Sequence, residues 1–146
     1  MQVMVLNGVN LDMLGHRDPA LYGGLSIDEL ETQIYAWAHE LTLTARCLHS
    51  NDEGQFIEWI HDAHGRSDGV IVNPGAWTHY SYAIRDALEI LDIPIVEVHL
   101  SNILAREEWR NTSVLEDLVA HRVLGQGPDG YREALEFFAA RRAESA

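Results

Sequence analysis

The sequence predicts an α/β fold in which helices cover both faces of a parallel β-sheet. Three observations lead to this prediction. Short apolar runs, such as residues 3–7 and 69–73, are typical of strands that are buried on both faces. Stretches with apolar residues at helical spacing separate these runs. The strand-then-helix order recurs about five times along the chain, which indicates a parallel sheet with helical crossovers.

The first strand is predicted over residues 3–7, and a long connection, residues 10–24, follows it. Such connections normally span about 2–6 residues, and longer ones are typically lids or linkers. The next helix is predicted within residues 26–41. Ser26 and Glu29 have the spacing of a capping box, and apolar residues recur after them at helical spacing.

The remaining elements continue the alternation. We expect strands over 44–50, 69–73 and 93–100, and helices over 53–65, 79–91 and 128–144. The 146 residues fit one domain, and no internal repeat or low-complexity linker divides them. Residues 1–146 are therefore expected to form a single domain.

Composition excludes several classes of function. The net charge of −13 repels nucleic acid and anionic membrane surfaces, and no basic patch offsets it. All ten basic residues are arginine, so a lysine imine, a Walker-type phosphate lysine and a pyridoxal-phosphate anchor are excluded. No apolar run is long enough for a membrane span, and the first residues do not resemble a signal peptide. We therefore expect a cytoplasmic protein.

Polar side chains follow the ends of three predicted strands. The first strand runs into Asn7 and Asn10, the third runs into Asn73, and the fourth runs into His99, Ser101 and Asn102. Ligands of open parallel sheets bind at the carboxyl ends of the strands, where the strand order reverses. Asparagines that merely cap turns would explain each position alone. The three strand ends together, with a histidine among them, favour a binding site.

Three segments resemble the signature segments of the type II 3-dehydroquinate dehydratases. They read LNGVNLDMLGHRDPALYG, NPGAWTHYSYAIRDAL and VEVHLSNILAREEWR, and the resemblance covers residues 3–110 with nearly the same spacing. The resemblance implies a flavodoxin-like, doubly wound, five-stranded parallel sheet. It also implies elimination of water from 3-dehydroquinate to give 3-dehydroshikimate, in the shikimate pathway or in quinate breakdown. No metal or organic cofactor is implied, and the implied assembly is a dodecamer made of four trimers.

The resemblance identifies residues 8–25 as a lid loop that carries the catalytic base. The tyrosine base of the family matches Tyr22, and its arginine partner matches Arg17. The reaction removes a proton next to a ketone, yet only about one tyrosine in a thousand is ionised at pH 7 when its pKa is near 10. An arginine held against Tyr22 favours the ionised form, because opposite charges stabilise each other.

The other catalytic roles are implied by the same resemblance. Asn10 and Asn73 match the asparagines around the enolate, where amide groups stabilise charge that develops in the transition state. His99 matches the general acid that protonates the leaving hydroxyl group. Glu97 lies two residues earlier, on the same strand face, where a carboxylate can orient the imidazole and favour its protonated form.

The substrate-binding residues are also carried over position by position. Leu100 and Ser101 match positions that hold the substrate carboxylate through backbone N–H groups and a hydroxyl. His79, Asp86 and Arg110 match residues that bind the ring hydroxyls, and Asp86 is expected to reach in from a neighbouring subunit. The remaining match is Arg106, in the second lid segment.

The chain departs from the family pattern in two places. Val9 replaces a proline in the first turn. In addition, TSVLEDLVAHRVLGQGPDGY (112–131) stands where the family has a serine-rich turn followed by a small, apolar last strand. Glu116, Asp117, His121 and Arg122 stand among these positions. The family uses this region for subunit contacts, so trimers are an alternative to the dodecamer.

Two other functions of doubly wound domains are a phospho-receiver and a flavin-binding module. A phospho-receiver needs clustered acids after its first strand and a lysine after its last, and a flavin-binding module needs a Ser/Thr-rich phosphate loop. The chain has neither set. A protein of this family acting on a related hydroxy-keto acid stays an alternative. His61 and His64 have helical spacing for a metal, but no third ligand matches them, so no metal site is expected.

Overall fold

The computed structural model describes residues 1–145 and contains a five-stranded, entirely parallel sheet. The strands are β1 (Gln2–Asn7), β2 (Thr44–His49), β3 (Gly69–Asn73), β4 (Ile95–His99) and β5 (His121–Leu124), in the spatial order β2-β1-β3-β4-β5. The chain moves outward from β1 to β2 and then returns to place β3 on the other side of β1. The strand order therefore reverses between β1 and β3, and the predicted doubly wound, flavodoxin-like fold is confirmed.

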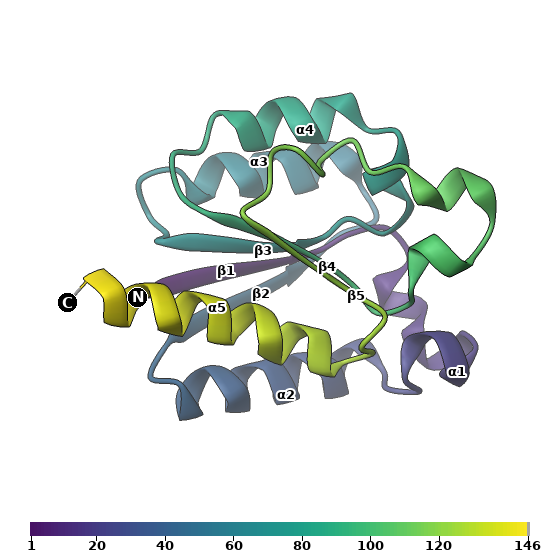
Figure 1. Cartoon of the computed structure of the whole chain (residues 1–146), viewed down its shortest axis with the longest axis horizontal. Helices are drawn as coiled ribbons and strands as arrows, with labels where there is room; N and C mark the ends of the chain where they lie inside the picture. The colour runs from purple at the N-terminus through teal and green to yellow at the C-terminus, as the bar shows by residue number, and fades with distance from the viewer. Residues whose placement is uncertain (146) are drawn as a thin grey trace.

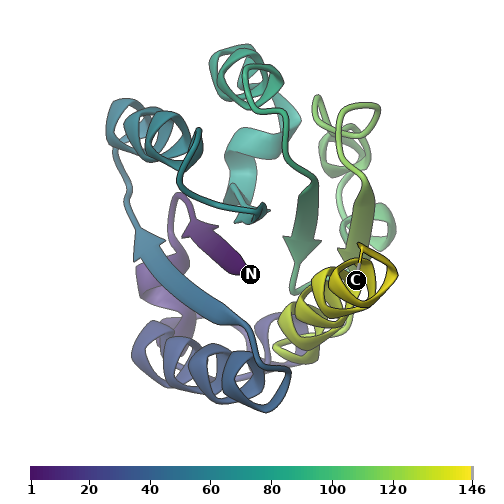
Figure 2. The ribbon, with the colours of Figure 1, turned by 90° about the vertical axis from the view of Figure 1, so that its left-hand side faces the viewer.

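Two layers of helices enclose the sheet (Figures 1 and 2). Helices α2 (Ile27–Glu40) and α5 (Asp129–Ser145) cover one face, and α3 (Glu53–Ala63) and α4 (Tyr82–Glu89) cover the other. Strand residues alternate between the two cores, because successive side chains point to opposite faces. Val5 packs with the α2 and α5 layer, whereas Met4 and Leu6 pack with the α3 and α4 layer.

Local signals set the ends of several helices. The capping box at α2 is present, since Glu29 N donates to Ser26 Oγ at 3.2 Å and Ser26 N donates to Glu29 Oε1 at 3.1 Å. The helix predicted over 79–91 is shorter. Residues 75–79 form a 3₁₀ helix, η2 (Gly75–His79), and α4 begins only after Ser81, whose hydroxyl accepts the Ile84 N–H at 3.1 Å.

The segment predicted as a lid loop, residues 8–25, is largely helical and not irregular. It contains the 3₁₀ helix η1 (Leu11–His16) and the single-turn helix α1 (Pro19–Tyr22). Leu11 and Leu14 are buried in the α2 and α5 core, so they anchor the segment to the body of the protein. In Figure 1 the segment lies beyond the carboxyl ends of the strands, together with residues 101–112.

Backbone contacts bring the ends of β1 and β3 together. Gly8 N donates to Asn73 O at 2.8 Å, and a Cβ on Gly8 would lie 2.5 Å from Pro74 O. Gly75 has a φ of +64°, and a Cβ there would lie 2.6 Å from Val9 O. Both positions therefore require glycine. The close contact between the turn after β1 and the turn after β3 forms one side of the candidate site.

Strand β5 occupies the region in which the sequence departs from the family pattern. It lies at the sheet edge beside β4, with Glu97 in register with Arg122. The preceding segment is held to α4 by Arg85, which donates to Val114 O at 2.7 Å and forms an ion pair with Asp117. Among residues 1–145, no helix is both long and apolar enough to cross a membrane.

Candidate active site

A cavity of about 210 Å³ opens at the carboxyl ends of the strands, beside the point where the strand order reverses. Its wall is built from the turn after β1, the lid segment, η2, and the segment that follows β4. Ten of the twelve predicted site residues line it: Asn10, Arg17, Tyr22, Asn73, His79, His99, Leu100, Ser101, Arg106 and Arg110. Glu97 and Asp86 do not.

Tyr22 lies between two arginines. Its side chain is mostly buried at the end of α1, and Arg106 Nη1 donates a 2.7 Å hydrogen bond to its hydroxyl oxygen. The same Nη1 donates to Ser101 Oγ at 3.0 Å. The guanidinium carbon of Arg17 lies 4.0 Å from the centroid of the tyrosine ring. Arg17 therefore contacts the ring face, while Arg106 contacts the oxygen that carries the proton.

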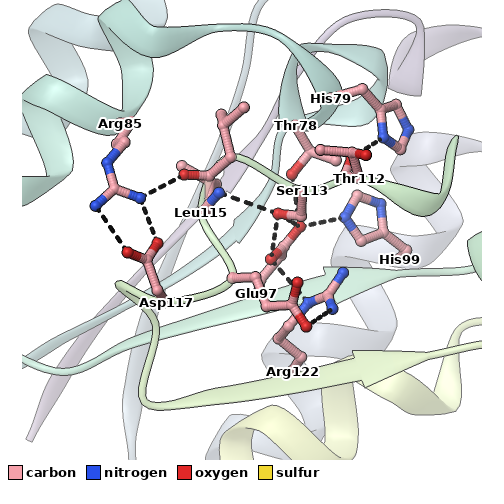
Figure 3. Close-up of polar contacts among 12 residues, drawn as sticks. Thr78, His79, Arg85, Glu97, His99, Thr112, Ser113, Leu115, Asp117 and Arg122 are labelled. Atoms are coloured by element: carbon pink, nitrogen blue, oxygen red, sulfur yellow. Dashed lines mark hydrogen bonds and ion pairs between the residues drawn. The ribbon is translucent and has the colours of Figure 1, made fainter. Parts of the chain in front are cut away.

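His99 and Glu97 form a hydrogen-bonded pair on β4 (Figure 3). His99 Nε2 lies 2.7 Å from Glu97 Oε2, and both side chains are almost completely buried. Burial raises the pKa of Glu97, but hydrogen bonds from His99 and Thr78 and the charge of Arg122 more than offset this, so its pKa lies below the ordinary value. Because Nε2 contacts Glu97, Nδ1 is the ring nitrogen of His99 that can contact a ligand in the cavity.

His79 lies beside His99 at the cavity wall. The two rings are stacked with centroids 6.3 Å apart, and Trp109 packs edge-on against His79 at 5.2 Å. His79 Nδ1 lies 2.7 Å from Thr112 O, so the protonated Nδ1 donates to that carbonyl. Burial lowers the pKa of His79, with further lowering from the nearby His99 and Arg110. A neutral His79 presents Nε2 as a hydrogen-bond acceptor.

The two asparagines have different surroundings. Asn10 is exposed, has a left-handed φ of 69°, and its backbone N donates to Asn51 Oδ1 at 2.7 Å. Asn73 is buried, and its Nδ2 donates to the Tyr131 hydroxyl at 2.9 Å while its Oδ1 accepts Gly75 N at 3.2 Å. These contacts fix which way the Asn73 amide points. The amide still has unused hydrogen-bonding positions, because it can make up to four bonds.

The cavity is strongly positive although the chain is acidic. Three of the ten arginines, Arg17, Arg106 and Arg110, line it. Glu107 pairs with Arg110 at 3.0 Å but is half exposed, and no carboxylate from residues 1–145 lines the cavity. Such a cavity favours a small anionic ligand, since positive groups in a partly desolvated cleft attract negative charge. Asp86, by contrast, is exposed on α4, away from this wall.

Sequence reasoning missed several residues of the site. Tyr131, from α5, is fully buried, and its hydroxyl donates to Asn7 Oδ1 at 2.6 Å as well as accepting from Asn73. Thr78, Ser113 and Arg122 all contact the Glu97 carboxylate. One of them carried a signal in the sequence, because Arg122 is among the charged residues that depart from the family pattern within residues 112–131.

The chain is similar to known proteins of one enzyme family. The family model described as dehydroquinase class II matches residues 1–139. The 3-dehydroquinate dehydratase of Halalkalibacterium halodurans is 48% identical over 133 residues, which cover 91% of this chain and 92% of that protein. The 3-dehydroquinate dehydratase of Syntrophotalea carbinolica is 50% identical over 135 residues, or 92% of this chain and 91% of that protein.

Solved structures show the same fold. The crystal structure of type II dehydroquinase from Propionibacterium acnes matches with a TM-score of 0.92 and 42% identity, over 95% of this chain and 96% of that one. A 3-dehydroquinate dehydratase-like protein from Bifidobacterium longum matches with a TM-score of 0.73 and 30% identity, over 97% of both chains. The chain belongs to the dehydroquinase class II family and is a hydro-lyase.

Proposed function

We propose that the protein eliminates water from 3-dehydroquinate to give 3-dehydroshikimate, with Tyr22 as the base and His99 as the acid. The observation that carries this proposal is the arrangement of one mostly buried tyrosine and one mostly buried histidine around the same arginine-lined cavity. The substrate is a carboxylate with a ketone and several ring hydroxyls. It matches a cavity that offers positive charge and many hydrogen-bonding groups.

Tyr22 takes the proton next to the ketone. Arg106 donates a hydrogen bond to the hydroxyl oxygen, which is the atom that would accept the proton. Arg17, over the ring, adds a second positive charge. Both arginines therefore support Tyr22 as the base, and Arg106 has the more direct contact.

The enolate and the leaving group need separate partners. Asn10 and Asn73 supply amide groups near the oxygen on which negative charge develops. His99 protonates the departing hydroxyl, and Glu97 holds the imidazole from behind through Nε2. Proton removal and hydroxyl departure thus occur through different side chains, on the lid and on β4.

The remaining predicted residues bind the substrate. Ser101 and the backbone of Leu100 hold the carboxylate, beside the guanidinium of Arg106. His79 and Arg110 bind ring hydroxyls, and Asp86 completes the site from a neighbouring subunit. The exposed position of Asp86 on α4 supports this assignment, since it cannot serve its own cavity from there. The tetramer of trimers and the cytoplasmic location stay predictions.

A direct assay tests the proposal. The product contains a conjugated enone, so 3-dehydroquinate added to the purified protein should produce a rise in near-ultraviolet absorbance. Removal of divalent metal by a chelator should leave the rate unchanged. Absence of enone formation with 3-dehydroquinate, together with turnover of another hydroxy-keto acid, would contradict the substrate assignment and leave the site assignment standing.

A further inference from the structure

The carboxylate behind His99 is held by an arginine from the edge strand. Arg122 Nε donates to Glu97 Oε1 at 3.1 Å, and Glu97 Oε2 is the oxygen that contacts His99 at 2.7 Å (Figure 3). The two oxygens thus have separate main partners, the guanidinium of Arg122 on one side and the imidazole of His99 on the other. Glu97 is completely buried, and the Arg122 side chain is 16% exposed.

Every group that contacts Glu97 is a hydrogen-bond donor. Thr78 Oγ1 donates to Oε2 at 2.5 Å, and Ser113 Oγ lies 3.0 Å from Oε2 and 3.1 Å from Oε1. The hydroxyl groups and the imidazole can also accept a hydrogen bond, whereas the Arg122 guanidinium can only donate. Arg122 is therefore the contact that requires an ionised Glu97 oxygen.

We propose that Arg122 is a positioning residue for the reaction, which keeps the Glu97 carboxylate ionised so that the proton shared by the Glu97–His99 pair remains on the imidazole. This inference rests on the proposed function only for its kinetic readout. Arg122 does not line the cavity, so it acts through Glu97 and not on the substrate.

The physical reason is the coupling of two buried groups. A buried carboxylate next to an imidazole can take its proton, because desolvation disfavours the charged form. If Glu97 took that proton, the pair would be neutral and His99 would lose its function as an acid. The positive charge of Arg122 opposes this transfer. The lowered pKa of Glu97, to which Arg122 contributes, agrees with that direction.

The charge of Arg122 also acts on the pair as a whole. A positive charge next to a titrating pair lowers its affinity for a proton, so loss of Arg122 must raise the pH at which the pair deprotonates. The other titratable or charged groups near the pair are His79, which stacks on His99, and Arg110, near His79. Glu116 lies at the outer end of Arg122, 3.4 Å from Nη1, and is largely exposed.

The test compares Arg122→Met with Arg122→Lys. The two new side chains have similar length, and only lysine keeps the positive charge. Arg132→Met is the matched control, because it removes an arginine on the exposed surface of α5 that pairs with Glu136 at 3.0 Å. The main readout is the NMR titration of the His99 ring in protein labelled with ¹³C-histidine, with the His99 signal assigned by its loss in His99→Asn.

We expect Arg122→Met to move the His99 titration midpoint to higher pH by about one unit, the lower end of the effect of one nearby charge. Arg122→Lys and Arg132→Met should leave it near the wild-type value. In the dehydration assay, Arg122→Met should lower kcat by up to about tenfold, which corresponds to one unit of proton affinity. KM should stay unchanged, and the alkaline limb of the kcat profile should move to higher pH.

A purely structural role would give a different result. If Arg122→Met lowered the melting temperature but left the His99 midpoint and the alkaline limb in place, the proposal would be wrong. An equal shift in Arg122→Lys and Arg122→Met would also contradict it, because the charge would not be the cause. Since the titration needs no substrate, a protein that fails to dehydrate 3-dehydroquinate would refute the proposed function without deciding this inference.

Discussion

Glu97→Gln tests the buried network with a change of almost no volume. The carboxylate accepts hydrogen bonds from Thr78, His99, Ser113 and Arg122. A glutamine amide has one acceptor oxygen, and its NH₂ group only donates. If the NH₂ group faces Thr78 and His99, both residues can accept its hydrogen bonds, because the Thr78 hydroxyl can rotate and His99 can change its tautomer. In every orientation Arg122 loses its buried carboxylate partner and keeps only the exposed Glu116.

The loss of stability expected for Glu97→Gln follows from the burial of the Glu97–Arg122 ion pair. Removing one partner of a buried ion pair costs about 3–5 kcal/mol, because the other charge is left uncompensated. Arg122 is 16% exposed and retains Glu116 at 3.4 Å, which favours the lower end of about 3 kcal/mol. With an unfolding entropy of about 2.1 cal/mol/K per residue, a chain of 146 residues should lose about 10 °C in melting temperature.

Calorimetry on four variants (Glu97→Gln, Arg122→Met, the double variant and a control) decides whether the charge is responsible. The double variant Glu97→Gln/Arg122→Met should be more stable than the sum of its single changes predicts, because it removes the uncompensated cation. Glu136→Gln is the control, since it breaks a pair with Arg132 at 3.0 Å in which both side chains are about half exposed, and it should change the melting temperature little. A Glu97→Gln effect no larger than that of the control, or strictly additive double-variant values, would refute the reasoning.

Three further predictions concern the reaction, the assembly and pH. Borohydride added with substrate should leave activity intact, because the 146 residues contain no lysine to form an imine; substrate-dependent inactivation with a covalent adduct would contradict this. Sedimentation should show a trimer at least, and a dodecamer if residues 112–124 allow it, because the proposed site includes Asp86 of a neighbouring subunit; an active monomer would rule this out. The folded-state pKa of His79 is lowered, so its stabilising contribution is present above the ordinary value of about 6.5 and is lost as pH falls below it. Denaturant midpoints between pH 7 and 5 should therefore fall more steeply in the wild type than in His79→Gln, and equal slopes would refute this.

Local sequence signals predicted the parts of the fold that depend on neighbours in the chain. The Ser26 and Glu29 capping box and the apolar period after it predicted α2 within one residue at each end. The period of two along a strand placed Glu97 and His99 on one face, and their side chains are in fact hydrogen-bonded. The pattern at 79–91 was less informative, because it did not show that Ser81 caps α4 while the preceding turn is 3₁₀.

Contacts between segments that are distant in the chain could not be predicted from the sequence. Thr78, Ser113 and Arg122 meet at Glu97 from 19, 16 and 25 residues away, and no local pattern links them. Tyr131 reaches Asn7 across 124 residues, which only the packing of α5 against the sheet explains. The charged residues of the last strand looked like a departure from a family pattern. In the structure, Arg122 is the neighbour in register with a buried carboxylate.

Exchange of the C2 proton of 3-dehydroquinate with solvent tests most directly whether Tyr22 is the base. Tyr22→Phe removes one oxygen atom and should leave the packing of α1 and substrate binding in place. Loss of a general base typically lowers the rate about 10²–10⁴-fold, or about 3–5.5 kcal/mol of barrier, so exchange and dehydration should both fall by this factor. His99→Ala should lose dehydration and retain exchange, because it lacks only the acid for hydroxyl departure. Exchange at the wild-type rate in Tyr22→Phe would show that another residue takes the proton.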